Sequence, residues 1–382
     1  MNEAVIVSAV RTPIARRGAS LKDLPPHYYG TKVLEEAVSR AGINGNEIDD
    51  IIYGNCLAGG GNIARYCGLQ SKLSIDIPGM TIDRQCGSGI NAVALAAQGI
   101  MAGTGSIYVA GGAESMSLTP QLIGAVNGQV KFVERPLSPK EIGNPPMGIT
   151  AENLAEKYQI SRQEQDEYAL MSQKRMANAQ KNGYFDEQIV PILVPQRKGE
   201  PIRFERDEHP RPDTTLEALA KLPPAFKKDG TVTAGNTSGV NDAASALVIM
   251  SREEAKKRGL ESLGTVKNYS VAGCDPNIMG IGPVPAVQKL LEKEGLTLED
   301  IDLIELNEAF AAQVLACDRE LKLDMEKVNV NGGAIAHGHP IAATGAILVT
   351  KLVYEMKRRN VKRGIVTACI GGGQGIALLV ER

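Results

Sequence analysis

The sequence predicts an α/β protein made of two similar halves, with a long insertion that interrupts the first half. Three observations support this fold class. Short apolar runs alternate with amphipathic helical patterns, which is typical of sheets covered by helices. A stretch of the last third repeats a stretch of the first third in register. Residues 117–224 hold more than half of the chain's 20 prolines and few continuous apolar runs, which indicates an inserted loop domain.

The local patterns predict the elements in order. Apolar and β-branched runs indicate strands, and amphipathic or alanine-rich runs indicate helices. The first half is expected to contain a strand at 4–9, a helix at 29–40, a strand within 47–53, a strand at 81–84, a helix at 90–102 and a strand at 106–110 that ends at Gly111-Gly112. The insertion is expected to contain helices at 151–158 and 162–182. Regular structure is expected to return at 242–250, with strands at 303–306 and 365–368.

An internal repeat aligns Gly42 with Gly295 without a gap, at an offset of 253 residues. Each glycine follows an amphipathic helix and precedes an Ile-Asp-x-Ile pattern that opens a strand, which indicates a duplicated unit. The same offset places Cys86 opposite His339. Two halves related by an approximate two-fold axis would bring these two residues together at facing helix ends. The alternation of strands and helices also predicts mostly parallel sheets.

Composition excludes several classes of function. Apolar residues make up 43% and charged residues 23% of the chain, as in a soluble globular protein, and the net charge of −2 favours neither nucleic acid nor an anionic membrane as partner. No apolar run is long enough to cross a bilayer, and the N-terminus is a strand without the features of a signal peptide. A cytoplasmic location is therefore expected. The six cysteines form no C-x-x-C and the chain has only four histidines, so no metal site is expected. Six cysteines could form three disulfides, but the length and the absent signal peptide argue for a reducing compartment.

His339 lies between a glycine-rich segment and Pro340, after which an apolar helical run begins. Proline favours the first helical position, which places His339 at a helix N-terminus. The helix dipole there disfavours an imidazolium, so a neutral imidazole could act as a base toward a thiol. On this pattern alone, a loop histidine without a role is an equally good interpretation.

Two cysteines lie beside glycines at the ends of strands. Cys86, in Q-C-G-S-G, precedes a helix whose dipole should stabilise the thiolate and lower the thiol pKa. Cys369 precedes Gly371, in a turn that exposes N–H donors. Each cysteine alone is more often a buried small hydrophobe. Asn307 follows the strand at 303–306, and its spacing alone favours a helix cap over a catalytic amide. No P-loop and no N-terminal G-x-G-x-x-G indicates a nucleotide site.

Taken together, the motifs C-G-S-G, N-E-A-F, G-H-P and C-I-G-G-G with Q-G resemble the active-site motifs of thiolases, in thiolase order. The resemblance covers the whole chain, including I-V-S-A-V-R-T-P at the start, G-G-A-E-S-M-S at 111–117, M-G-I-T-A-E-N at 147–153 and T-A-G-N-T-S-G at 233–239. It implies the duplicated five-layer αβαβα fold. It also implies an N-terminal half at 1–116 and 240–262, a loop domain at 117–239 that covers the coenzyme A (CoA) site, and a C-terminal half at 263–382.

The resemblance implies a role for each catalytic position. Cys86 would take the acyl group as a thioester, and His339 would activate it. His339 and a water held by Asn307 would form one oxyanion hole. Cys369 would act as acid and base on the α-carbon of the second acetyl-CoA. The N–H groups of Cys86 and Gly371 would form the second oxyanion hole. No metal or cofactor is implied, because the CoA thioesters are substrates.

Six further positions resemble residues that bind CoA or the acyl group in the family, with packing or surface solvation as the alternative for each. Ser238 would contact the pantetheine arm, and Arg211 would lie near the adenine nucleotide. The acyl pocket would be lined by Phe226, Phe310, Met147 and Met279. The chain departs from the family pattern at His337, where a leucine is usual, at Gln374 in G-Q-G, at Ala342 in G-H-P-I-A and at Pro146.

The resemblance to short-chain thiolases implies an acetyl-CoA C-acetyltransferase, with acetyl-CoA, acetoacetyl-CoA and CoA as partners. A degradative thiolase acting on longer 3-oxoacyl-CoA is the alternative within the fold, and a catalytically silent CoA-binding scaffold is the alternative from another class. Intact Cys86, Asn307, His339 and Cys369 disfavour the scaffold. The family also implies a homodimer or a tetramer. The segment at 117–146 is shorter than the family's tetramer-forming loop, which leaves the two states open.

Overall fold

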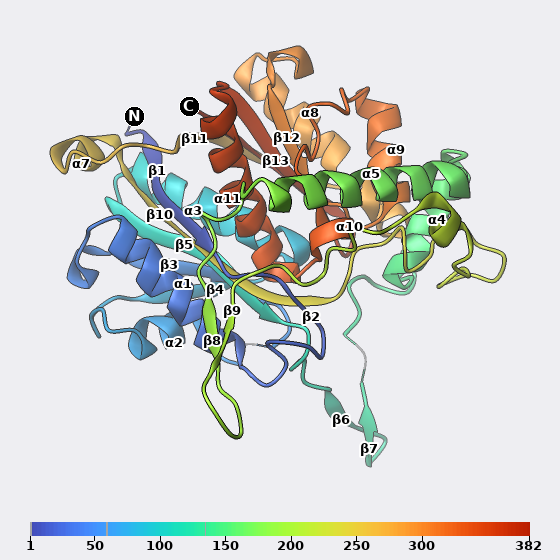
Figure 1. Ribbon diagram of the computed structural model, residues 1–382, viewed down its shortest axis with the longest axis horizontal. Helices are drawn as coiled ribbons and strands as arrows, with labels where there is room; N and C mark the ends of the chain where they lie inside the picture. Colours follow the sequence, from blue (N-terminus) through green and yellow to red (C-terminus); the bar gives the residue numbers. More distant parts are fainter. Residues whose placement is uncertain (1, 59, 134) are drawn as a thin grey trace.

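One large mixed sheet runs through the molecule (Figure 1), and the computed structural model describes residues 2–58, 60–133 and 135–382. In spatial order its strands are β12 (Leu303–Leu306), β13 (Arg363–Ile370), β14 (Gln374–Glu381), β11 (Gly264–Gly273), β1 (Ala4–Arg11), β10 (Asn241–Ser251), β5 (Ile107–Ser115), β3 (Asp50–Gly54) and β4 (Gly79–Ile82), with the short β2 (Ala15–Arg16) beside β10. The sheet consists of two halves that meet where Ala4 to Ile6 of β1 pair with Gly264 to Val266 of β11.

Most strand pairs are antiparallel, so the prediction of mostly parallel sheets is wrong. Only β3 with β4, β3 with β5 and β12 with β13 run parallel within the described part of the large sheet. The reason is that short connections join strands that are neighbours in the sheet. A three-glycine turn joins β13 to β14, and the short helix α7 (Arg252–Lys257) joins β10 to β11. Antiparallel neighbours need no long crossover.

Helices cover both faces of each half-sheet and fill the space between the halves. The main helices are α1 (Pro26–Arg40), α2 (Ile63–Gln70), α3 (Ser88–Ala102), α8 (Pro283–Glu294), α9 (Ala311–Leu321) and α11 (Ile341–Arg359). One apolar core joins α1 and α2 to the N-terminal half-sheet, and another joins α8 and α9 to the C-terminal half-sheet. A third core joins α3 and α11 to both half-sheets. The result is the five-layer αβαβα arrangement that the sequence predicted.

The duplication is visible element by element. β3 begins at Asp50 and β12 at Leu303, while α3 begins at Ser88 and α11 at Ile341, and both pairs are 253 residues apart. The glycines after α1 and α8 also share a left-handed backbone, with φ of 61° at Gly42 and 64° at Gly295. The repeat found in the sequence is therefore a repeat of structure.

The two central helices touch at their glycines. A Cβ atom on Gly89 of α3 would lie 2.4 Å from the backbone nitrogen of Ala346, and one on Gly345 of α11 would lie 2.3 Å from that of Ile90. Side chains larger than hydrogen would push the helices apart. This close crossing brings the N-terminal ends of α3 and α11 together, and with them the residues just before each helix.

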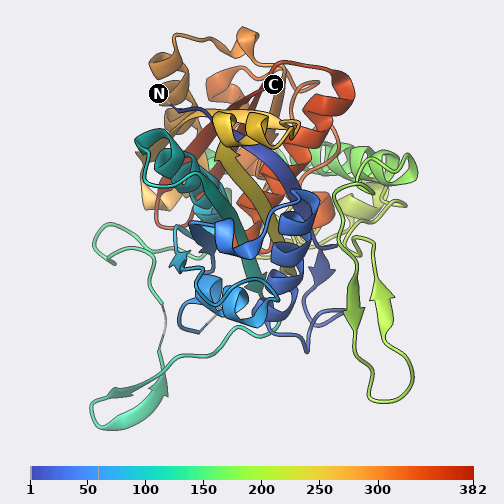
Figure 2. The same cartoon turned by 90° about the vertical axis from the view of Figure 1, so that its left-hand side faces the viewer.

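The segment between β5 and β10 contains the helices α4 (Met147–Lys157), α5 (Arg162–Lys181) and α6 (Leu216–Ala220) and two hairpins, β6 (Ile123–Val126) with β7 (Gln129–Phe132) and β8 (Ile192–Val194) with β9 (Ile202–Phe204). Both hairpins project away from the body (Figures 1 and 2). The strand predicted to end at Gly111-Gly112 instead continues to Ser115. Those glycines lie inside β5 because Ser245 and Ala342 approach their backbone closely. None of the described helices is long and apolar enough to cross a membrane.

Candidate active site

Cys86 lies in a short helical turn, Gln85–Gly87, immediately before α3. Gln85 adopts a left-handed backbone with φ of 46°, an uncommon conformation for a residue with a side chain. The Asp83 carboxylate stabilises this turn by accepting the Gln85 N–H at 2.8 Å, and Gly87 packs directly on Ile370 and Ile376. The turn is therefore held by both halves of the molecule, and it presents the Cys86 thiol at their junction.

His339 faces Cys86 from the other half, with its Nε2 atom 3.2 Å from the Cys86 Sγ atom. Its Nδ1 atom lies 2.7 Å from the Thr344 hydroxyl, and its backbone N–H donates to the Asn241 side chain at 3.0 Å. With Nδ1–H donating to Thr344, Nε2 is free to accept the thiol proton. The predicted juxtaposition of Cys86 and His339 is present. Thr344, which contacts the imidazole, and Asn241, which accepts from the His339 backbone, were missed, because no local pattern links them to His339.

Burial decides the protonation state of this pair. It lowers the pKa of His339 to about 4, so the imidazole is neutral at pH 7. It also raises the pKa of the Cys86 thiol to about 11, although the backbone N–H groups of Gly371 and of Cys86 itself offset part of this effect. The prediction of a lowered thiol pKa was wrong, because desolvation outweighs the helix end. The resting pair is a neutral thiol beside a neutral base, which suits proton transfer during attack.

Cys369 and Gly371 bring the end of β13 to the same place. The backbone N–H of Gly371 lowers the pKa of the Cys86 thiol, and this N–H belongs to the predicted oxyanion hole. Burial raises the pKa of Cys369 well above its usual value, and the neighbouring Cys86 raises it further. Leu137, from the segment before α4, lies over the turn, since a Cβ on Gly371 would come within 2.8 Å of it.

Asn307 is fully buried, and neither its amide nitrogen nor its amide oxygen has a hydrogen-bond partner among the described residues. It does not cap a helix, because α9 begins at Ala311 after Phe310 as its N-cap residue. The helix-cap interpretation, which spacing alone favoured, is therefore wrong. A buried amide with both groups free is costly unless a ligand or water completes it. This is the position that the resemblance assigns to a water-binding amide.

The residues predicted to line the acyl pocket form one apolar cluster around Cys369. Met279 and Phe310 are buried in it, and Met147, at the first position of α4, packs against it. Phe226 covers the cluster from outside, with its ring edge-on to Phe310 at 6.2 Å between centroids. Phe226 is 42% exposed, so it borders the cluster rather than filling it.

The two residues predicted to bind CoA lie farther along the insertion. The Ser238 N–H donates to the Ala309 carbonyl at 3.0 Å, which ties this serine to the N-E-A-F segment. Arg211 is exposed and lies at a cavity of about 410 Å³ that is also lined by His209, Ala218 and Gly235. Both remain predictions as CoA contacts.

Two buried carboxylates that the sequence analysis did not single out hold the site together. Glu114, from the G-G-A-E-S-M-S motif, accepts three consecutive backbone N–H groups, those of Cys56, Leu57 and Ala58, at 3.0–3.3 Å. Glu308, next to Asn307, accepts hydrogen bonds from four groups: the Tyr168 and Ser172 hydroxyls, the Asn329 amide and the Ile335 N–H. The motifs themselves were the signal that could have revealed them.

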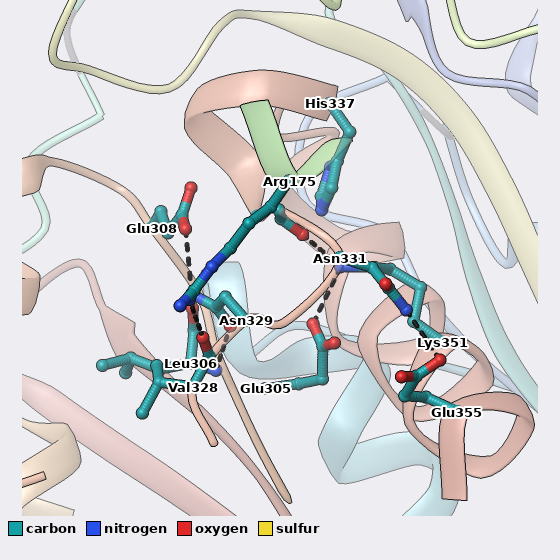
Figure 3. A network of polar contacts seen from close by, with 12 residues as sticks. Arg175, Glu305, Leu306, Glu308, Val328, Asn329, Asn331, His337, Lys351 and Glu355 are labelled. Atoms are coloured by element: carbon teal, nitrogen blue, oxygen red, sulfur yellow. Dashed lines mark hydrogen bonds and ion pairs between the residues drawn. The ribbon is translucent and has the colours of Figure 1, made fainter. Parts of the chain in front are cut away.

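Glu308 is part of a buried polar network beneath the loop that leads to His339 (Figure 3). Lys351 of α11 donates to Glu305 at 2.8 Å and to the Gly332 carbonyl at 2.7 Å, while Asn331 donates to Glu355 at 2.8 Å. Buried charges need such complete pairing. The network fixes the glycine-rich loop and thereby the starting point of α11.

The departures from the family pattern have distinct surroundings. His337 is buried, with Nδ1 at 2.8 Å from the Gly338 carbonyl and Nε2 without a partner among the described residues. Pro146 is the N-cap residue of α4. Gln374 begins β14 and accepts a hydrogen bond from Arg84. Ala342 is buried where β5 and α3 approach α11. None of these side chains displaces Cys86, His339 or Cys369.

Comparison with known proteins assigns the class. The chain, whose duplicated α/β fold places a cysteine and a histidine at facing helix ends, matches two family models. These are the thiolase N-terminal domain over residues 4–253 and the thiolase C-terminal domain over residues 260–382. The chain therefore belongs to the thiolase family.

Individual relatives are similar over their full length. An acetyl-CoA acetyltransferase of Cupriavidus necator is 48% identical, with all of both chains covered. The crystal structure of the Bacillus anthracis acetyl-CoA acetyltransferase has a TM-score of 0.95 and 47% identity, covering 100% of this chain and 99% of that one. Human mitochondrial 3-ketoacyl-CoA thiolase in complex with CoA has a TM-score of 0.92 and 43% identity, covering 100% and 98%.

Proposed function

We propose that this protein is an acetyl-CoA C-acetyltransferase, which reversibly condenses two acetyl-CoA to acetoacetyl-CoA and CoA through an acetyl-Cys86 intermediate. One observation carries the proposal: the neutral His339 base lies 3.2 Å from the Cys86 thiol, in a chain whose third catalytic candidate, Cys369, lies in a buried apolar cluster. The acetyl-CoA acetyltransferases at 47–48% identity support the acetyl group as substrate.

In the first half-reaction, Cys86 attacks the thioester carbonyl of acetyl-CoA while its proton moves to His339 Nε2. The resulting oxyanion is stabilised by the N–H groups of Cys86 and Gly371, and the collapse of the tetrahedral species expels CoA, which takes the proton from His339. A covalent intermediate divides one difficult transfer into two easier steps. The N–H donors are fixed by the backbone before charge develops, which is the effective form of electrostatic stabilisation.

In the second half-reaction, the thiolate form of Cys369 removes an α-proton from a second acetyl-CoA. The enolate oxygen is held by His339 and by a water on the Asn307 amide. The enolate carbon attacks acetyl-Cys86 to release acetoacetyl-CoA, and the departing Cys86 thiolate takes the proton from Cys369, which restores the Cys369 thiolate. Acetylation helps this step, because acetyl-Cys86 cannot ionise and so cannot raise the pKa of Cys369 as a Cys86 thiolate would. These proton transfers use side chains alone, so the proposal needs no cofactor beyond the CoA thioesters.

CoA itself would lie between the insertion and the C-terminal half. Ser238 is tied to the segment that carries Asn307, and the cavity at Arg211 is lined by residues of the insertion and by Ile335 of the C-terminal half. We propose that the loop domain at 117–239 covers this path, with Ser238 on the pantetheine arm and Arg211 near the nucleotide. We also propose a cytoplasmic homodimer, with a tetramer as the alternative assembly.

The test is to identify the acylated residue. Wild-type protein mixed with acetyl-CoA should show an acetyl adduct on Cys86 by peptide mass spectrometry. Cys86→Ser should abolish the adduct and the activity while the circular dichroism spectrum stays that of wild type, because a serine hydroxyl is far less ionised than a thiol. The exposed Gln196→Ala is a matched control that should keep both. An adduct on Cys369 alone would reverse the roles of the two cysteines.

A 3-ketoacyl-CoA thiolase for longer chains remains the second candidate, since a relative of that name is 43% identical over the whole chain. Turnover of 3-oxoacyl-CoA of graded length separates the two candidates. A preference for acetoacetyl-CoA supports the first, and equal or faster turnover of six-carbon and longer substrates supports the second.

A further inference from the structure

The Arg84–Gln374 hydrogen bond connects the two loops that together would form one oxyanion hole. Arg84 lies two residues before Cys86, and Gln374 lies three residues after Gly371. The Arg84 Nη1 atom donates to the Gln374 side-chain oxygen at 3.2 Å. The nucleophile loop belongs to the N-terminal half and the glycine turn to the C-terminal half, so this hydrogen bond crosses the junction between the halves.

Both ends of this connection are anchored in rigid structure. The Arg84 Nε–H also donates to the buried Asn91 side chain on α3, and the Arg84 backbone N–H donates to the Ser88 hydroxyl at 2.8 Å. The Gln374 backbone lies in the sheet, paired with Gly273 and Ile370. The backbone of Gly282 also packs so closely on the Gln374 carbonyl that a Cβ there would lie 2.1 Å away. The Arg84–Gln374 hydrogen bond therefore joins two elements of fixed position, α3 and the C-terminal half-sheet.

The proposed chemistry depends on the distance between the backbone N–H groups of Cys86 and Gly371. The oxyanion of the first half-reaction needs the N–H groups of Cys86 and Gly371 at the same time, and small displacements of preorganised donors reduce catalysis strongly. We propose that Arg84 and Gln374 are positioning residues that hold these two donors in register across the junction. Neither side chain touches the reacting atoms, and the inference rests on the proposed function of Cys86 and Gly371.

The connection predicts a specific kinetic effect. Gln374→Met removes the acceptor while keeping a side chain of similar length, and Arg84→Met removes the donor. Each change should lower the rate of acetyl exchange between acetyl-CoA and isotopically labelled CoA about tenfold, because this exchange reports acylation of Cys86. The KM for acetyl-CoA should stay within about twofold of wild type, since the bond does not contact substrate.

The pair should also behave as one unit. The double variant should be no slower than the slower single variant, which is the signature of two residues that act through one interaction. Gln374→Glu should retain at least about a third of the exchange rate, because a carboxylate still accepts from the guanidinium. Gln196→Met, at an exposed glutamine whose side chain reaches only the Val194 carbonyl, is the matched control and should match wild type.

The possible outcomes distinguish failure of the positioning role from failure of the proposed acetyltransferase function. Wild-type protein that exchanges no label would contradict the proposed function. Wild-type exchange that Gln374→Met leaves unchanged would overturn only the positioning role, because the packing of Gly87 on Ile370 and Ile376 would then suffice to hold the loops. A large rise in KM, or additive losses in the double variant, would also overturn it.

Discussion

Replacing Met279 should change which acyl chains the pocket accepts. Met279 is 3% exposed and shares one apolar cluster with Cys369 and Phe310, so its side chain occupies space next to the reacting atoms. In wild-type protein a longer acyl chain would have to displace these side chains, and overpacking of this kind costs about 1–3 kcal/mol. Acetoacetyl-CoA should therefore exceed a six-carbon 3-oxoacyl-CoA by about tenfold or more in kcat/KM.

Met279→Ala removes the side chain beyond Cβ and leaves room for about two methylene groups. Burying each methylene contributes about 0.8 kcal/mol, so the six-carbon substrate should gain about 1.6 kcal/mol, or about 15-fold in kcat/KM, relative to acetoacetyl-CoA. The same change should lower the free energy of unfolding by about 2–5 kcal/mol, because part of the cavity stays empty without substrate. Both quantities are measurable, by thiolysis assays with graded substrates and by denaturant unfolding.

Met250→Ala is the matched control. Met250 is fully buried in the core that joins α1 and α2 to the N-terminal half-sheet, which is a different cluster from that of Cys369. It should lose a similar amount of stability with no change in the ratio of kcat/KM values. An unchanged ratio in Met279→Ala, or an equal shift in Met250→Ala, would refute the reasoning that Met279 closes the acyl pocket.

Four further results are expected. Asn307→Leu should lower condensation activity by about 10²–10³ without lowering stability, because the amide has no hydrogen-bond partner to lose among the described residues. Marked destabilisation would contradict the water-binding role. Alkylation of Cys86 by iodoacetamide should keep rising to pH 9 and beyond, since its pKa is about 11, and a plateau near pH 7 would indicate a preformed ion pair. The pKa values of His339 and His209 in the folded state are lowered to about 4, so the unfolded chain binds more protons than the folded chain below pH 6.5. The free energy of unfolding should therefore fall as the pH is lowered from 6.5 to about 4. Urea titrations that give constant stability over this range would contradict this expectation. Light scattering should report a dimer or larger, and a monomer would contradict the proposed assembly.

The sequence alone determined the architecture and the pairing at its centre. The 253-residue repeat predicted a duplicated α/β fold and placed Cys86 opposite His339 before any contact was known. This was possible because a duplicated unit places equivalent residues at equivalent points, so that a match in sequence becomes a relation in space. The helix start just after Pro340 was also predictable, since proline fixes φ and favours the first turn of a helix. The starts predicted at 29 and 151 were late, because α1 begins at Pro26 and α4 at Met147.

Tertiary structure decided everything that depends on burial or on partners distant in the chain. The helix end beside Cys86 predicted a lowered thiol pKa, but desolvation by residues from both halves raised it instead. Strand direction was mispredicted because short returns such as β13–β14 leave no clear local signal. Thr344 and Asn241 beside His339, the free amide of Asn307 and the Arg84–Gln374 bond were likewise invisible in the sequence. These features arise only when separate segments are packed together, because hydrogen-bond satisfaction and desolvation are properties of the whole fold.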